Sequence, residues 1–116
     1  MFMIMFVLED IQLADAILES WTKIGITGAT IIESSGLHRR LKKAVPMRYA
    51  FRIGMSVEIG NLTFLVIVKN DKMVKACLES IEEIVGDLNE PNTGIFSAWP
   101  LSTVKGIPSP EQKERY

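Results

Sequence analysis

The sequence contains one cysteine, one histidine and few aromatic residues, and these shortages exclude several classes of protein. The single Cys77 cannot form a disulfide within the chain, which is typical of proteins in a reducing cytoplasm. Aromatic residues make up 8% of the chain, too few to interleave with basic residues as they do in proteins that bind single-stranded nucleic acid. The net charge is −1, so there is no overall electrostatic attraction to nucleic acid or to membranes.

No long hydrophobic run is present either. The apolar segment 1–8 lacks the basic start and small-residue cleavage site of a signal peptide, and two acidic residues follow it directly. Eight residues are far fewer than the ~20 that a membrane-spanning helix needs. We therefore predict a cytoplasmic protein with no direct membrane insertion.

The chain is rich in apolar residues for its size. Its 116 residues are 47% hydrophobic, which is enough for one globular domain with a core of its own. We assign this domain to residues 1–107 and interpret the polar residues 108–116 as a C-terminal tail.

The order of predicted elements indicates an α+β fold. Apolar runs at 2–8, 27–34, 62–68 and 94–99 predict strands. Apolar residues at three- and four-residue spacing predict helices at 11–24 and 72–88, capped by Asp10 and Asp71. The order βαββαβ is that of the ferredoxin-like fold, an antiparallel sheet with two helices on one face. Because strands 2–8 and 62–68 are apolar at nearly every position, we expect the other face to be covered by oligomerisation, and a trimer is one solution.

The stretch 25–39 combines a helix stop, a strand and a glycine exit into a basic loop, which indicates a ligand-binding or partner-sensing site. The loop carries several cations, among them Arg39, Arg40, Lys42, Lys43 and Arg52. Such a loop either binds phosphate groups or is simply solvated. With so few aromatic residues near it, nucleic acid is not the predicted partner.

The same stretch closely resembles the nitrogen-regulatory PII signalling proteins. The resemblance lies in Ile24-Gly25-Ile26-Thr27-Gly28-Ala29-Thr30, in Glu33 and in Gly36-Leu37-His38-Arg39, and it returns at 66–81 and at 94–96. It implies a trimer of ferredoxin-like subunits that binds an adenine nucleotide (AMP, ADP or ATP) between subunits. It further implies regulation of a membrane transporter or an enzyme through a mobile loop, here 37–60. The site residues that it implies are Thr30, Gly36, Leu37, His38, Arg39 and Lys105.

The chain departs from the PII pattern at three cationic positions. Pro91-Asn92-Thr93-Gly94 replaces the family's Gly-Asp-Gly-Lys, and Leu62 and Ile107 replace a lysine and an arginine. Each lost charge-assisted contact is worth ~1.5–3 kcal/mol. The chain therefore resembles a divergent member, whose effector is a nucleotide with fewer phosphates or a small anion such as bicarbonate.

Two other classes of protein compete with this interpretation. The CutA proteins share the fold and bind metal as trimers, which would require His38 or Cys77 to be multiplied by assembly. An enzyme would require a nucleophile with its base, a metal motif or a phosphate-binding loop, and the sequence shows none. We predict that the protein is not an enzyme.

Overall fold

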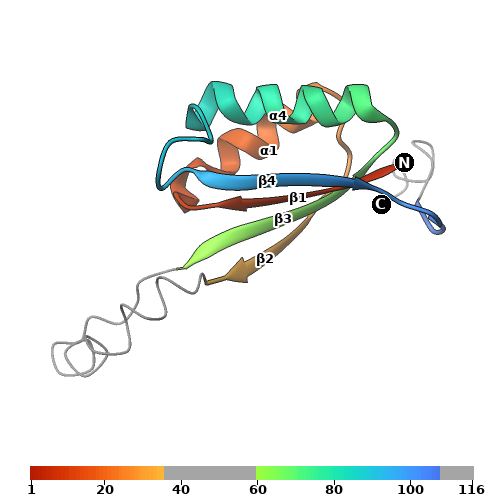
Figure 1. Cartoon of the computed structure of the whole chain (residues 1–116), viewed down its shortest axis with the longest axis horizontal. Coiled ribbons are helices and arrows are strands. Elements are labelled where there is room, and N and C mark those ends of the chain that lie inside the picture. The colour runs from red at the N-terminus through yellow and green to blue at the C-terminus, as the bar shows by residue number, and fades with distance from the viewer. Residues whose placement is uncertain (36–59, 108–116) are drawn as a thin grey trace, which may run out of the picture.

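The structure, a computed structural model, describes residues 1–35 and 60–107. In this part of the chain, four strands alternate with two α-helices and one short 3₁₀ helix (Figure 1). The elements in order are β1 (Phe2–Leu8), η1 (Ile11–Leu13), α1 (Ala14–Lys23), β2 (Thr30–Ser34), β3 (Asn61–Val68), α4 (Asp71–Val85) and β4 (Gly94–Pro100).

The four strands form one antiparallel sheet in the order β2-β3-β1-β4. Strand β1 lies in the interior of the sheet, pairing Phe6 with Phe64 of β3 and with Phe96 of β4. The predicted α+β class is confirmed, and the arrangement is compatible with a ferredoxin-like fold. Because all neighbours are antiparallel, β2 ends where β3 begins, so the two ends of the intervening chain 36–59 start from the same end of the sheet.

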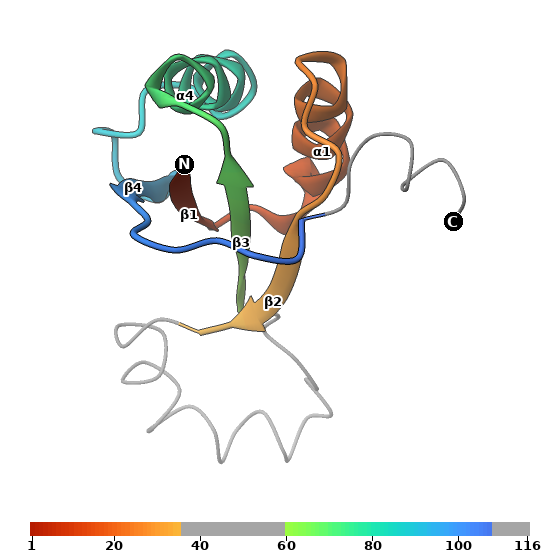
Figure 2. The same ribbon diagram turned by 90° about the vertical axis from the view of Figure 1, so that its right-hand side faces the viewer.

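Both helices lie on one face of the sheet (Figures 1 and 2). Their inward residues meet alternate residues of β1 and β3 in a core that is almost completely buried. Trp21 of α1 packs edge-on against Phe64 with ring centres 5.7 Å apart, and Phe6 stacks on Phe64 at 5.9 Å. The other members of this core are Ile4, Leu8, Ile17, Val66, Val68, Cys77 and Ile81.

The helix starts differ slightly from the prediction. Asp10 accepts a hydrogen bond from the Gln12 amide, as expected of a cap, but the turn that it caps is 3₁₀ and α1 begins only at Ala14. The cap of α4 is Asn70 rather than Asp71, because the Asn70 carboxamide oxygen accepts from the Met73 amide at 2.9 Å. Asp71 instead forms the first residue of the helix, where its charge favours the helix dipole.

The opposite face of the sheet is not covered by any described element. The residues of β1 and β3 that alternate with the core positions point to this face, which we call the open face. They are Met3, Met5, Val7, Thr63, Leu65 and Ile67. Among the described residues, no helix has the length and hydrophobicity needed to cross a membrane.

Candidate functional site

The predicted site residues divide between the two ends of the sheet. Thr30 is the first residue of β2 and is exposed; it pairs with Leu65, three residues before the end of β3, and lies towards the end of the sheet where β3 and β4 finish. We call this the tail end, because residues 101–107 leave β4 there and cross the end of the sheet (Figure 2). Lys105 belongs to this segment and is also exposed. Gly36, Leu37, His38 and Arg39 lie outside the described residues.

The chain that leads to those four residues departs from the other end of the sheet, which we call the loop end. Ser35 is the last described residue there and lies five residues from Thr30. At about 3.3 Å per residue, this separates the two positions by roughly 16 Å.

At the loop end, the end of β2 and the start of β3 lie very close together. A Cβ atom placed on Gly60 would overlap the carbonyl oxygen of Ser34, so only glycine fits at this position. The Ser34 hydroxyl donates to the Asn61 carboxamide oxygen and lies 2.8 Å from the Thr63 hydroxyl. Asn61 is only 5% exposed. These contacts hold the end of β2 beside the start of β3, and they depend on the pairing of two strands far apart in the sequence.

The loop 86–93 also reaches the loop end, but it is unsuited to phosphate. Three of its amides already have partners: Leu88 donates to the Glu82 carboxylate of α4, Asn89 donates to the Asp87 carboxylate, and Glu90 donates to the Asp87 carbonyl. The loop contains the carboxylates of Asp87 and Glu90 and has no lysine or arginine. Since a phosphate site needs free amides or cations, the composition of this loop disfavours phosphate binding here.

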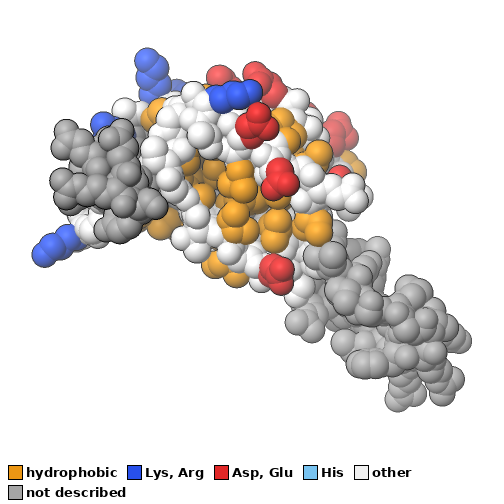
Figure 3. Space-filling view, turned by 180° about the vertical axis from the view of Figure 1, so that it is seen from behind, with side chains coloured by type: hydrophobic (Ala, Val, Ile, Leu, Met, Phe, Trp, Pro, Cys, Tyr) orange, Lys and Arg blue, Asp and Glu red, His pale blue; other side chains and the backbone are white. Residues whose placement is uncertain are grey.

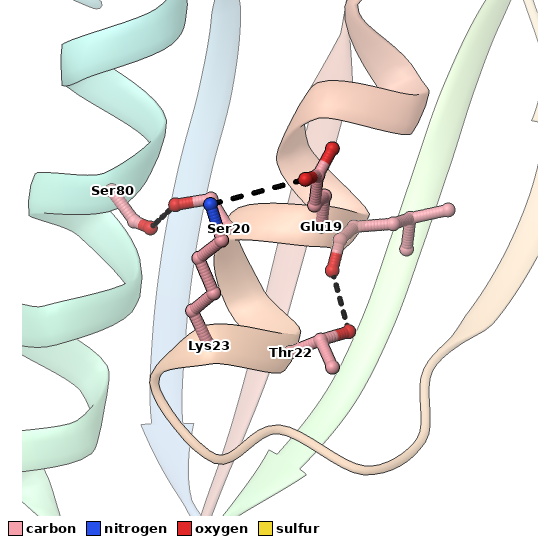
Figure 4. A network of polar contacts seen from close by, with 6 residues as sticks. Glu19, Ser20, Thr22, Lys23 and Ser80 are labelled. Carbon is pink, nitrogen blue, oxygen red and sulfur yellow. Dashed lines mark hydrogen bonds and ion pairs between the residues drawn. The ribbon is translucent and has the colours of Figure 1, made fainter.

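The helical layer contains polar contacts that are structural. The hydroxyls of Ser20 and Ser80 lie 2.8 Å apart between α1 and α4, and the Thr22 hydroxyl donates to the carbonyl of its own helix at Leu18 (Figure 4). Lys23 pairs with Glu19 at 3.8 Å on the exposed side. These groups bond to one another, and none points to a catalytic arrangement.

Cys77 of α4 is fully buried in the core. Burial raises the pKa of its thiol to about 11, so the reactive thiolate is scarce at neutral pH. Among residues 1–35 and 60–107, no group of three or more His, Cys, Asp or Glu side chains is placed to hold a metal ion. His38, the other residue of the metal hypothesis, is not described.

Two hollows flank the sheet on its helical side. One lies between α4 and β4, has a volume of about 360 Å³ and is lined by Leu78, Glu82, Leu88, Ile95 and Phe96 among others. The second, the α1–β2 groove, has a volume of about 290 Å³. Its walls are Leu18, Trp21 and Thr22 from α1, Ile26 and its neighbours from the connection, and Ile31 from β2. This groove could not be predicted from the sequence, because it forms where α1 and β2 pack against each other, and local sequence patterns do not determine that packing.

Comparison with known proteins adds no assignment to these positions. No protein-family model matches the chain, and no curated protein matches it significantly. The function is therefore inferred from the residues and the geometry described above.

Proposed function

We propose that this chain is a PII-like regulatory protein, a homotrimer that binds a small effector between subunits and controls a partner through the loop 37–60. The observation that carries the proposal is the combination of an apolar open face with a loop whose base is closed by Gly60, Ser34 and Asn61. An uncovered apolar face favours assembly, and a fixed base allows a bound effector to change the orientation of the loop. The resemblance at 24–39 supports the same function.

The proposed effector contacts Thr30, Gly36–Arg39 and Lys105, the site residues that the resemblance implies. The positive charges available to it are Arg39 and Lys105, whereas the loop 86–93 supplies carboxylates. A triphosphate would meet this acidic loop without a compensating lysine. The proposed effector is therefore an adenine nucleotide with fewer phosphates, AMP or ADP before ATP, or a small anion such as bicarbonate. The chain acts by binding, not by catalysis.

Isothermal titration with AMP, ADP, ATP and bicarbonate tests the effector site. We expect AMP or ADP to bind more tightly than ATP, and Lys105→Ala to weaken that binding several-fold. Lys72→Ala is the matched control, because Lys72 is an exposed lysine on α4 and its replacement leaves binding unchanged. No heat with any of the four ligands would count against the proposal.

Light scattering tests the assembly independently of the ligand. We expect three times the 13.0 kDa mass of the chain. A monomer at micromolar concentration would exclude an effector site between subunits, whatever the titrations show.

A further inference from the structure

Strand β2 is an edge of the sheet and carries few of the features that protect edges. It pairs with β3 on one side, and no described strand pairs with its other side. Proteins commonly protect such edges with lysine or proline, but β2 contains neither, whereas β4 at the opposite edge ends in Pro100. The side chain of Ile31, in the middle of β2, is 43% exposed. This edge is therefore available for a further strand.

The α1–β2 groove lies directly beside this edge. Ile31 forms one wall, and Leu18 and Trp21 form the other. The polar side chains on the α1 wall, Trp21 and Thr22, already have hydrogen-bond partners. Trp21 Nε1 donates to the Cys77 carbonyl, and the Thr22 hydroxyl donates to the Leu18 carbonyl. The volume of about 290 Å³ exceeds the ~150 Å³ that accommodates benzene. The groove thus suits one large apolar side chain.

The surroundings of the groove are acidic. Glu33 lies two residues after Ile31 and so points to the same side of the sheet, and it is exposed. Asp15 precedes Leu18 by three residues, which places it beside the groove on the surface of α1. Figure 3 shows acidic side chains on both sides of the central hydrophobic area, with no lysine or arginine between them. An occupant with positive charge beside its apolar residues fits this pattern.

We propose that the β2 edge and the α1–β2 groove together bind an extended peptide of a partner protein by strand addition, and that this peptide alternates apolar with basic residues. Main-chain hydrogen bonds form along the free edge of β2, an apolar side chain fills the groove, and a basic side chain pairs with Glu33. This is an established mode of peptide recognition on other folds. The peptide uses the edge of β2 and, through Ile31 and Glu33, its helical side, whereas Thr30 of the proposed effector site points to the open face. The inference therefore does not depend on the proposed effector.

Charge favours a foreign basic peptide over the two occupants that the chain itself could supply. Two copies joined through β2 would bring Glu33 and Asp15 of each close to like charges of the other. The tail 108–116 has equal numbers of acidic and basic residues, and its Pro108 and Pro110 cannot donate to a neighbouring strand.

A synthetic heptapeptide that alternates lysine or arginine with isoleucine or valine, labelled with a fluorophore, is the probe. Binding to the full chain is measured by fluorescence anisotropy at low and high salt. We expect saturable binding that weakens as salt rises. Two versions of the peptide, N-methylated at odd or at even positions, test strand addition, because only alternate amides of an added strand face the sheet. One version should lose binding and the other keep it.

Variants locate the binding surface. We expect Ile31→Lys to weaken binding at least tenfold, and Glu33→Lys to weaken it about fivefold while improving binding of a peptide with glutamate in place of its basic residues. The matched control is Ile95→Lys, an isoleucine 65% exposed on the opposite edge strand, which should leave affinity unchanged. Thermal melts confirm that each variant is folded.

Four outcomes would overturn the inference. The peptide fails to bind, both N-methylated versions bind equally, or Ile31→Lys binds as the parent does. The fourth is evidence that another occupant fills the surface. A tenfold rise in peptide affinity on removal of 108–116 would assign the groove to the tail. A lower mass of the Ile31→Lys variant in solution would assign the edge to a second copy.

Discussion

The two faces of the sheet are built from the same strands and are similarly apolar, but only one is covered by helices in the described part of the chain. On the helical face, Phe6 and Phe64 are fully buried against α1 and α4. On the open face, Met5 and Leu65 alternate with them and remain only half-buried. Apolar side chains in these numbers gain stability only when water is removed from them. The difference indicates that the open face is built to be covered.

The open face also has a polar boundary. Ser34, Asn61 and Thr63 point to this side of the sheet and gather at the loop end. Towards the tail end the face is apolar, with Leu65 and Ile67 of β3 next to Met3 and Met5 of β1. A partner surface that packs on the apolar part would leave the loop end uncovered.

The largest effect that separates the two faces is expected from Phe64→Ala. It removes a ring that contacts both Trp21 and Phe6, and we expect a loss of about 3–5 kcal/mol in the free energy of unfolding. Leu65→Ala, one residue along on the open face, should cost much less at low protein concentration, where the proposed trimer would dissociate. Urea denaturation of both variants measures the difference, and equal losses would show that the faces are equivalent.

A smaller but more diagnostic effect is expected from Ile67→Glu on the open face. A carboxylate at this position would lose its water when the face is covered, and charges are costly to bury without a partner. We expect the dissociation constant of the assembly to rise at least tenfold, about 1.4 kcal/mol, while circular dichroism of the subunit is unchanged. Sedimentation of Ile67→Glu measures this dissociation constant, with Ile67→Thr as the uncharged control. An unchanged mass distribution would leave the open face without a role in assembly.

The fold could be predicted from the sequence to the extent that local patterns determine it. The apolar runs located all four strands, and Asp10 marked a helix start, because periodicity and capping are properties of neighbouring residues. The site could not be predicted in the same way. That Thr30 lies at the opposite end of the sheet from Ser35 follows from the pairing of β2 with β3, and the approach of Gly60 to Ser34 depends on the register of that pairing.

Gly60→Ala tests the polar boundary of the open face. The added methyl group would overlap the Ser34 carbonyl oxygen, so β2 and β3 must separate where the loop begins. We expect a loss of about 2 kcal/mol in stability, together with faster amide exchange at Ser34 and Asn61. Gly86→Ala is the control: its φ of 96° is strained for alanine but nothing lies within 4 Å, so about 1 kcal/mol is expected. Equal losses, with unchanged exchange, would mean that the loop base tolerates a side chain.

The smallest effect concerns Cys77, in the core on the helical face. It is a change in the pH dependence of stability, and it is absent at neutral pH. Its folded pKa of about 11 lies above the ordinary value of 9.0 because burial disfavours the thiolate. Between these values the unfolded chain has lost the thiol proton and the folded chain retains it, so stability falls as pH rises from 9 to 11. Cys77→Ala should remove this part of the dependence of the unfolding free energy on pH. Denaturation of the variant and of the parent at pH 8, 9, 10 and 11 measures the difference. An identical slope in the variant, or rapid reaction of the folded parent with an aromatic disulfide at pH 8, would show that water reaches the face beneath α4. The contrast between the two faces would then be one of degree, with neither closed within a single chain.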